Sequence, residues 1–230
     1  MPDLTTIAFD ADDTLWHNER HFRLTMARFA GLLADFAPAD HLRDRLLAAE
    51  RRNLARYGYG VKGFVLSMIE TAIDVTEDRV PASVIRNLID AGHDMLAHPT
   101  ELLPGVEETI LGLKGRYRLM IVTKGDLLDQ QRKVAESGLG DHFDAVEVVP
   151  DKTVPVYDAL FRRHGVTPDR AAMVGNSLKS DVIPVLAIGG WGIHVPHDLT
   201  WELERDIAPT GHARFAELRH VGELPQWLVV

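Results

Sequence analysis

The sequence predicts an α/β fold in which a helical segment is inserted after the first strand of a parallel sheet. From residue 99 onward, short apolar runs alternate with helical patterns, which is typical of a parallel sheet covered on both faces. Residues 4–10 form another strand-like run, but residues 17–98, which have helical periodicity, separate it from the others. The simplest arrangement keeps this first strand in the sheet and inserts the helices after it.

The inserted residues are expected to form successive amphipathic helices. Apolar residues spaced by four and three positions define the first helix, at Phe22, Met26, Phe29, Leu33 and Phe36. Similar patterns cover residues 42–57, 64–73 and 84–96, with proline or glycine between them at Pro38, residues 58–63 and Pro81. We expect residues 16–99 to form a helical cap domain and residues 1–15 with 100–230 to form the α/β core.

The rest of the core follows the same alternation. Helices are expected at residues 106–113, 127–137, 154–164 and 179–188. Strands are expected at residues 118–123, 144–149, 171–175 and 191–195. Residues 198–230 are less periodic, and we expect them to cover an edge or a face of the core.

The composition is that of an ordinary globular protein and excludes several functions. With 230 residues, 46% of them hydrophobic, the chain can bury a substantial core. A net charge of −9 argues against a nucleic-acid polymer as partner, and the absence of cysteine excludes disulfides and zinc–thiolate sites. No apolar run approaches the roughly 20 residues of a membrane span, and the first residues lack a secretory pattern. We therefore expect a cytoplasmic protein without membrane association.

Three carboxylates directly follow the first strand. The segment FDADDTLW contains Asp10, Asp12 and Asp13. Like charges about 4 Å apart repel by roughly 1–4 kcal/mol, depending on the local dielectric. A segment that accepts this cost is expected to hold a positive group or to perform chemistry.

Polar residues also follow the later strands. Because the carboxyl ends of parallel strands meet at one edge of a sheet, we expect these side chains to converge. They are Asp10, Asp12 and Thr14 after the first strand, Thr123, Lys124 and Gly125 after the second, Lys152 after the third, and Asn176, Ser177 and Asp181 after the fourth. Each residue alone fits a helix cap or a solvated loop, but the set in this order indicates a functional site.

The chemistry that this set suits is phosphoryl transfer. Asp10 is an oxygen nucleophile able to form an aspartyl-phosphate, and Asp12 can act as general acid and then as general base. Carboxylates together with Asn176 supply the hard oxygen ligands that Mg²⁺ prefers. The substrate phosphate would be held by Thr123, Lys124, Gly125 and Lys152.

These motifs resemble those of the haloacid dehalogenase-like (HAD) superfamily of hydrolases, in its helical-capped, phosphoglycolate phosphatase-like branch. The D-x-D-x-T signature stands at residues 10–14, and the second motif is a strand ending in Thr123. The third motif, a lone lysine, stands at Lys152, and the fourth stands as GNSLKSD with Asn176 and Asp181. The match runs from the first strand to about residue 195.

The resemblance implies a Rossmann-like core, Mg²⁺ as cofactor and the catalytic roles given above. It assigns the metal to the Asp10 carboxylate, the main-chain carbonyl of Asp12, Asn176 and Asp181. The family usually has aspartate where this chain has Asn176; the amide oxygen can still ligate, but Asp181 would then carry more of the binding, directly or through water. Dehalogenases of the family lack the second aspartate of the signature, so Asp12 favours phosphate chemistry.

A glycine-rich loop in the cap, residues 57–63, is the candidate for substrate contact. Its glycines make it pliable, its two tyrosines can stack or donate hydrogen bonds, and Lys62 could meet an anionic group. The alternative is a plain connector between helices with its tyrosines packed inward. Residues of the cap would exclude water and select the substrate.

The sequence thus predicts a Mg²⁺-dependent phosphatase that hydrolyses a small phosphomonoester through an aspartyl-phosphate. A phosphomutase of the same fold and a non-enzymatic aspartyl-phosphate switch are the alternatives. A binding protein that kept only the fold is disfavoured because Asp10, Asp12, Thr123 and Lys152 are intact. Phosphoglycolate, sugar phosphates and nucleoside monophosphates all remain candidate substrates, and the protein could be a monomer or a homodimer.

Overall fold

The computed structural model describes residues 3–229 and divides into two compact units. The α/β unit comprises the described residues up to Glu19, Thr100–Lys124 and the described residues from Gln130 on. The helical unit comprises Arg20–Pro99 and Gly125–Asp129. The short segment Gly125–Asp129, which sequence reasoning assigned to the core, thus associates with the inserted helices.

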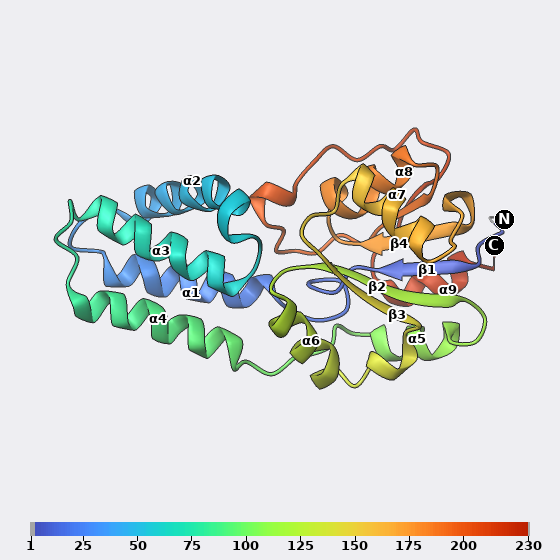
Figure 1. Ribbon diagram of the computed structural model, residues 1–230, viewed down its shortest axis with the longest axis horizontal. Coiled ribbons are helices and arrows are strands. Elements are labelled where there is room, and N and C mark those ends of the chain that lie inside the picture. Colours follow the sequence, from blue (N-terminus) through green and yellow to red (C-terminus); the bar gives the residue numbers. More distant parts are fainter. Residues whose placement is uncertain (1–2, 230) are drawn as a thin grey trace. The chain divides into compact units, whose positions relative to one another are not determined.

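A six-stranded parallel sheet forms the centre of the α/β unit, which confirms the predicted fold class (Figure 1). The strand order is β3-β2-β1-β4-β5-β6. The strands are β1 (Thr6–Phe9), β2 (Arg118–Lys124), β3 (Ala145–Val149), β4 (Ala171–Gly175), β5 (Trp191–His194) and β6 (Phe215–Glu217). The sequence pattern did not reveal β6, because three residues are too few to show an alternation.

Strand β1 lies at the point where the order of the strands reverses. It pairs with β2 on one side and with β4 on the other, so that Phe9 lies opposite both Ile121 and Val174. The three strand ends are therefore adjacent in space. Ligands of open α/β sheets bind beyond the carboxyl ends of the strands at such a reversal.

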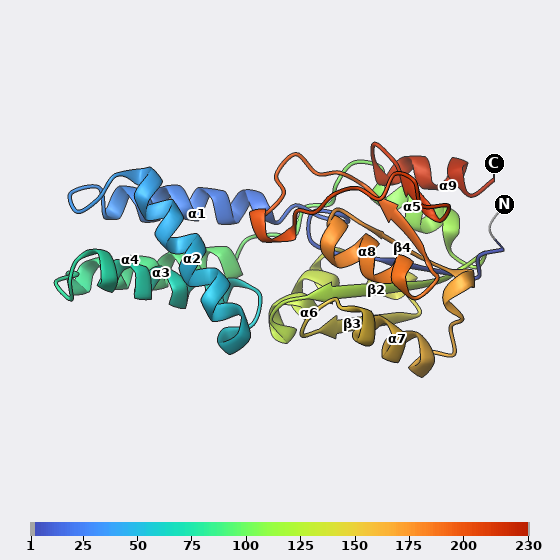
Figure 2. The same ribbon diagram turned by 90° about the horizontal axis from the view of Figure 1, so that it is seen from above.

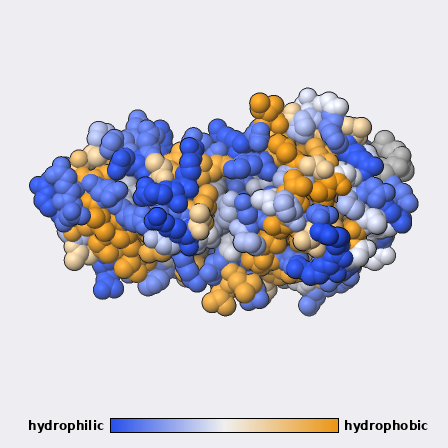
Figure 3. Space-filling model, turned by 45° about the horizontal axis from the view of Figure 1, so that its top comes forward, coloured by the Kyte–Doolittle hydropathy of each residue, from blue (hydrophilic) through white to orange (hydrophobic). Residues whose placement is uncertain are grey.

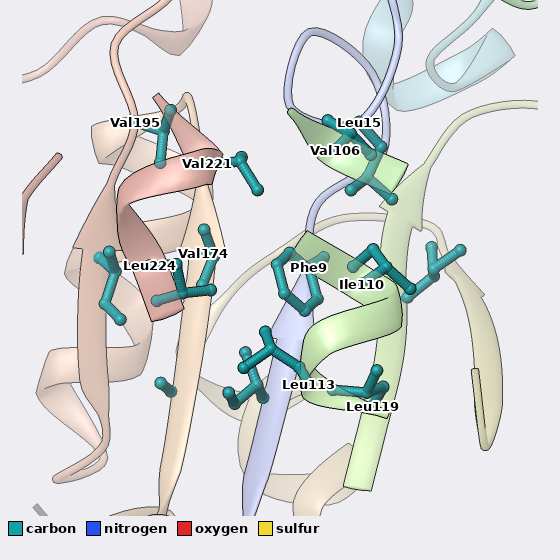
Figure 4. Packing of buried hydrophobic residues seen from close by; sticks show 14 of the residues in the cluster. Phe9, Leu15, Val106, Ile110, Leu113, Leu119, Val174, Val195, Val221 and Leu224 are labelled. Carbon is teal, nitrogen blue, oxygen red and sulfur yellow. The ribbon is translucent and has the colours of Figure 1, made fainter. Parts of the chain in front are cut away.

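Both faces of the sheet are covered, because successive side chains of β1 point to opposite sides. On one face Phe9 packs with Ile110 and Leu113 of α5 and with Leu224 of α9 (Figure 4). On the other, Ala8 packs in a cluster with residues of α7 and α8. Figure 2 shows α5 and α9 on the opposite side of the sheet from α7. The helices of this unit are α5 (Val106–Leu113), α6 (Leu127–Glu136), which starts in the helical unit, α7 (Val154–Arg163), α8 (Ile183–Ala187) and α9 (Leu224–Trp227).

One predicted helix departs from regular geometry. The pattern at residues 179–188 predicts a single helix, but the structure begins it with a π-helical turn, η3 (Leu178–Val182), before α8. Such turns are rare and are frequently found at functional sites. The remaining short elements are the 3₁₀ turns η1 (Gly140–His142), η2 (Pro168–Arg170), η4 (Glu202–Glu204) and η5 (Val221–Glu223).

The C-terminal residues cover part of the core, as expected for residues 198–230. Val221, Leu224 and Leu228 are buried in the cluster around Phe9. The Trp227 ring packs edge-on against Trp191 of β5, with 5.7 Å between the ring centroids. These contacts bring the end of the chain onto the sheet face that α5 also covers.

The helical unit is formed mainly by the helices between residues 19 and 96 (Figure 1). They are α1 (Glu19–Leu32), whose first residue belongs to the α/β unit, α2 (Ala39–Tyr57), α3 (Val61–Val75) and α4 (Ala82–Leu96). Phe29, Leu33 and Leu46 are among the fully buried residues of its core. The placement of Leu33 and Phe36 on the first helix was wrong, because α1 ends at Leu32. Leu33 is nevertheless buried, whereas the Phe36 side chain is exposed. Within residues 3–229, no helix has the length and apolar character needed to span a bilayer.

Hydrophobic residues also reach the surface of both units, among hydrophilic neighbours (Figure 3). The large exposed ones include Leu24 and Leu66 in the helical unit and Leu111 and Ile207 in the α/β unit. Singly exposed apolar side chains are normal for a globular protein.

Candidate active site

An ion-paired triad lies buried at the reversal point of the sheet. Asp10 follows β1, Lys152 follows β3, and Asp181 lies on the π-helical turn after β4. The Lys152 ammonium donates to Asp10 Oδ1 and, at 2.6 Å, to Asp181 Oδ1. The Lys152 and Asp181 side chains are 2% and 1% exposed. The structure therefore brings together three residues that the sequence pattern placed on different strand ends.

Burial and neighbouring charges act in opposite directions on the pKa values of Asp10 and Lys152. Burial raises the pKa of Asp10 to about 7, although the Lys152 charge opposes the rise, and the neighbouring charge of Asp181 adds to it. Burial alone would lower the pKa of Lys152, but Asp10 and Asp181 raise it above its ordinary value, so the amine stays charged. One cation thus faces two buried carboxylates, and a further positive charge would stabilise the ionised site.

Gly175, the last residue of β4, allows Asp181 to approach the strand end. A Cβ atom built at Gly175 would lie 2.2 Å from Asp181 Oδ2 and 2.3 Å from its Cγ, which is a severe overlap. The Asp181 carboxylate also accepts the Ser177 amide N–H at 2.9 Å. A side chain at Gly175 would therefore displace the carboxylate that the triad needs.

Thr14 connects Asp10 with Asn176. Its hydroxyl lies 3.3 Å from Asp10 Oδ2 and 3.4 Å from the side-chain Oδ1 of Asn176. The same hydroxyl accepts a hydrogen bond from the backbone N–H of Asn176 at 3.1 Å. Two predicted metal ligands from neighbouring strand ends thus share one hydroxyl. Among residues 3–229 no three His, Cys, Asp or Glu side chains are grouped to hold a metal. A metal here would need the amide oxygen of Asn176 beside the carboxylates of Asp10 and Asp181, and such oxygen donors fit Mg²⁺.

Asp12 is held by three donors that sequence reasoning did not connect with it. Trp16 Nε1 and Lys133 Nζ donate to Asp12 Oδ1 at 2.8 and 3.0 Å. Gln130 Nε2 lies 3.2 Å from Asp12 Oδ2. Gln130 and Lys133 are three residues apart on α6, so they share one face of that helix, and this spacing is the only signal that could have pointed to them.

The end of β2 supplies the predicted phosphate-binding residues. Thr123 is buried, and its hydroxyl accepts a hydrogen bond from Gln130 Nε2 at 2.5 Å. Gly125 has a φ of 129°, which favours glycine at this turn. The Lys124 ammonium already has partners within the chain: it donates to Glu204 Oε1 at 2.6 Å and to Ser180 Oγ at 2.8 Å.

Asp13 has a structural role in the signature loop. It takes a left-handed backbone conformation, with a φ of 60°, where glycine would be the least strained residue. Its carboxylate accepts the amide N–H groups of Asn18 and Glu19 at 2.9 Å, at the start of α1. Burial raises the pKa of Asp13 to about 6, while the Asn18 N–H counteracts the rise. The third carboxylate of the opening cluster is therefore a helix cap in this loop.

The candidate cap residue Lys62 lies in the helical unit. Its ammonium pairs with Asp126 at 2.8 Å, and that pairing contributes to a lowered pKa for Asp126. Gly60 of the same loop is so close that an added Cβ would lie 3.1 Å from the Asp126 amide nitrogen. Tyr57 is exposed and donates to Glu70 at 2.8 Å, so this tyrosine is not packed inward.

The fold and these motifs place the chain in a known family. The haloacid dehalogenase-like hydrolase model matches residues 4–189, which is most of the chain. The protein therefore belongs to the haloacid dehalogenase-like hydrolase family, as the signature motifs predicted.

Individual relatives agree with this assignment. A haloacid dehalogenase-like family hydrolase from Xanthomonas campestris superposes with a TM-score of 0.88 at 38% identity, covering 99% of this chain and 91% of that one. L-2-haloacid dehalogenase from Xanthobacter autotrophicus shares the fold, with a TM-score of 0.67 at 17% identity over 98% of each chain. Glyceraldehyde 3-phosphate phosphatase from Methanothermobacter thermautotrophicus is 33% identical over 109 residues, 45% of this chain and 48% of that protein. The match thus spans about half the length of that curated relative.

Proposed function

We propose that this hydrolase is a Mg²⁺-dependent phosphatase that acts on a small phosphomonoester through an aspartyl-phosphate on Asp10. The observation that carries the proposal is the pairing of a nucleophile, Asp10, held by the Lys152 ammonium, with a second aspartate, Asp12, two residues on. A displacement at phosphorus needs both an oxygen nucleophile and a separate proton donor. The relative named as a phosphatase supports the same class of substrate.

The first half of the reaction forms the phosphoenzyme. An Asp10 carboxylate oxygen attacks phosphorus while the bond from phosphorus to the alcohol oxygen breaks. Asp12 gives its proton to that departing oxygen. Lys152, Thr123 and the N–H groups near Gly125 bind the phosphoryl oxygens and balance their charge.

The second half releases phosphate. Asp12, now a carboxylate, takes a proton from a water molecule as the water attacks phosphorus, and the bond to Asp10 breaks. Trp16 and Lys133 keep the Asp12 carboxylate in one orientation for both proton transfers. Asp10, Asn176, Asp181 and the Asp12 carbonyl would hold Mg²⁺, which supplies charge stabilisation for the transferring phosphoryl group.

The helical unit is proposed to act as the substrate-selecting cap. Lys62 is then a residue whose ammonium would have to exchange Asp126 for a substrate anion. This is a separate claim from the chemistry at Asp10, and it is tested by the change in substrate preference of Lys62→Met. Equal losses for every substrate would contradict it.

The test is phosphate release from a panel of phosphomonoesters, with Mg²⁺ and with EDTA, together with halide release from 2-haloacids. We expect turnover with Mg²⁺, no turnover with EDTA, and no turnover for Asp10→Asn. The control is Asp141→Asn, the same change at an exposed position, which should behave as wild type.

The alternatives give different results. Halide release without phosphate release would make the protein a dehalogenase. One phosphate per protein with a long-lived phosphoenzyme would indicate a switch. Transfer of the phosphoryl group back to the product, without free phosphate, would indicate a mutase.

A further inference from the structure

Glu204 lies outside every motif of the sequence, yet its carboxylate is surrounded by partners from two strand ends. It belongs to the 3₁₀ turn η4, in the C-terminal region that was expected only to cover the core. Its Oε1 accepts from Lys124, and its Oε2 accepts from Ser177 and Ser180 at 2.6 and 2.5 Å. The Glu204 side chain is 13% exposed.

Each partner is the immediate neighbour of a residue in the proposed site, and Lys124 is itself one of the residues predicted to bind phosphate. Lys124 follows Thr123 at the end of β2. Ser177 follows Asn176, and Ser180 precedes Asp181 in the turn after β4. The Lys124 ammonium also donates to Ser180 Oγ at 2.8 Å, which closes the network. Glu204 therefore joins the phosphate-binding strand end to the metal-binding turn.

The same serines fix the backbone that carries Asp181. Ser177 Oγ accepts the Ser180 N–H at 2.9 Å, and the Ser177 N–H donates to Asp181 Oδ2 at 2.9 Å. Each hydroxyl thus donates to Glu204 and accepts from another group, so its hydrogen-bonding capacity is used in both directions. Ser177 therefore connects the two acids, because its hydroxyl donates to Glu204 and its backbone N–H donates to Asp181.

The network requires an ionised acid at position 204. Both Glu204 oxygens face donors only, and a carboxylate is the side chain that accepts at both oxygens. Burial raises the pKa of Glu204, but Lys124 and the hydrogen bonds outweigh this and hold the pKa below its ordinary value. An amide at this position would direct its NH₂ group at a lysine or at serine hydroxyls that donate.

We propose that Glu204 is a positioning residue of the active site, which keeps Lys124 and the Ser177–Ser180 turn at a fixed spacing. The Glu204 clamp, meaning Glu204 with Lys124, Ser177 and Ser180, sets the distance between the groups that bind phosphate and those that bind the metal. The catalytic part of this inference rests on the proposed phosphatase function. The structural part does not.

The experiment compares Glu204→Gln with Glu202→Gln, the same change at an exposed position in the same turn. For a buried partner of site residues, losses of roughly 10- to 100-fold are typical. We expect Glu204→Gln to lower kcat by that factor, with a smaller change in KM, at a temperature where both variants are folded. Glu202→Gln should match wild type.

A second measurement needs no substrate. Amide hydrogen exchange at Ser180 and Asp181 is expected to accelerate in Glu204→Gln and not in Glu202→Gln. If Glu204→Gln does not fold, Ser180→Ala removes one hydroxyl of the clamp without stranding a charge, and it should show the same two effects with smaller size. In a double-mutant cycle, Lys124→Met with Glu204→Gln should lose less than the product of the two single losses.

Two results would overturn the clamp: wild-type kcat in folded Glu204→Gln, or unchanged exchange at Ser180 and Asp181. A fall in melting temperature with normal kcat would show that Glu204 only stabilises the fold, which also contradicts a positioning role. Failure of the proposed function has a different signature. Wild type would then release no phosphate, while the exchange measurement would still decide whether the clamp exists.

Discussion

The two units of the molecule differ in one charged feature: the α/β unit, which also has exposed ion pairs such as Arg162–Asp158, buries a triad of charged side chains. In the α/β unit, Asp10, Lys152 and Asp181 have side chains that are 10%, 2% and 1% exposed. In the helical unit, the pair Arg28–Asp94 is 40% and 74% exposed. Exposed pairs stabilise a protein little, whereas buried charges cost free energy unless each is compensated. The buried, compensated charges of the α/β unit support the proposal that the chemistry takes place there, whereas the helical unit packs around an apolar core.

The largest effect on this comparison is expected from removing the central cation. Lys152→Met leaves two carboxylates buried without their partner, which typically costs about 3–5 kcal/mol. Arg28→Met breaks an exposed pair and should cost about 0.2–1 kcal/mol. Urea unfolding at pH 8 measures both free energies. Similar losses in the two variants would show that the buried triad is not energetically distinct from the surface pairs.

A smaller effect is expected at Gly175, where space rather than charge is limiting. Gly175→Ala forces a Cβ into the Asp181 carboxyl group, and overpacking of this kind costs about 1–3 kcal/mol. Turnover should fall with it, since Asp181 must move. Gly112, within α5, has nothing within 4 Å of an added Cβ, so Gly112→Ala should be neutral or stabilising. Thermal unfolding of both variants, with kcat for each, provides the check; normal turnover in Gly175→Ala would refute the close approach.

The smallest effect separates the two roles of Asp13. Asp13→Ala removes the cap on α1, which costs about 0.5–2 kcal/mol, and keeps a side chain at a φ of 60°, as in wild type. Asp13→Gly removes the cap but relieves the strain, so it should be about 1 kcal/mol more stable than Asp13→Ala. The free energies of unfolding decide this, and equal values would mean that the backbone is not strained there.

Sequence reasoning performed best where structure is determined locally. The strand ends carrying Asp10, Thr123 and Asn176 could be located because short apolar runs mark parallel strands and because their carboxyl ends share one edge. The prediction was wrong at Phe36, whose spacing continued the pattern past the true end of α1. Residues 33–36 form a turn there, and the spacing of apolar residues does not show where a helix ends. Spacing alone also cannot distinguish a π-helical turn from an α-helix, which is why η3 was not foreseen.

The supporting residues of the site could not be read from the sequence. Glu204 lies 80 positions from Lys124 along the chain, and Lys133 lies 121 from Asp12. Acids and lysines on a surface loop or helix are ordinary in composition, and only the folded chain shows which of them face inward. The roles of the motif residues themselves stay predictions until they are measured.

The most direct test of the central claim is to locate the phosphoryl group on the protein. With p-nitrophenyl phosphate, whose leaving group needs no proton from Asp12, Asp12→Asn should form the phosphoenzyme but discharge it slowly, because the base that activates water is missing. Acid quenching during turnover, followed by mass spectrometry of the peptides, should then find one phosphoryl group on Asp10 and none in Asp10→Asn. A phosphoryl group on another residue, or full turnover in Asp10→Asn, would contradict the account.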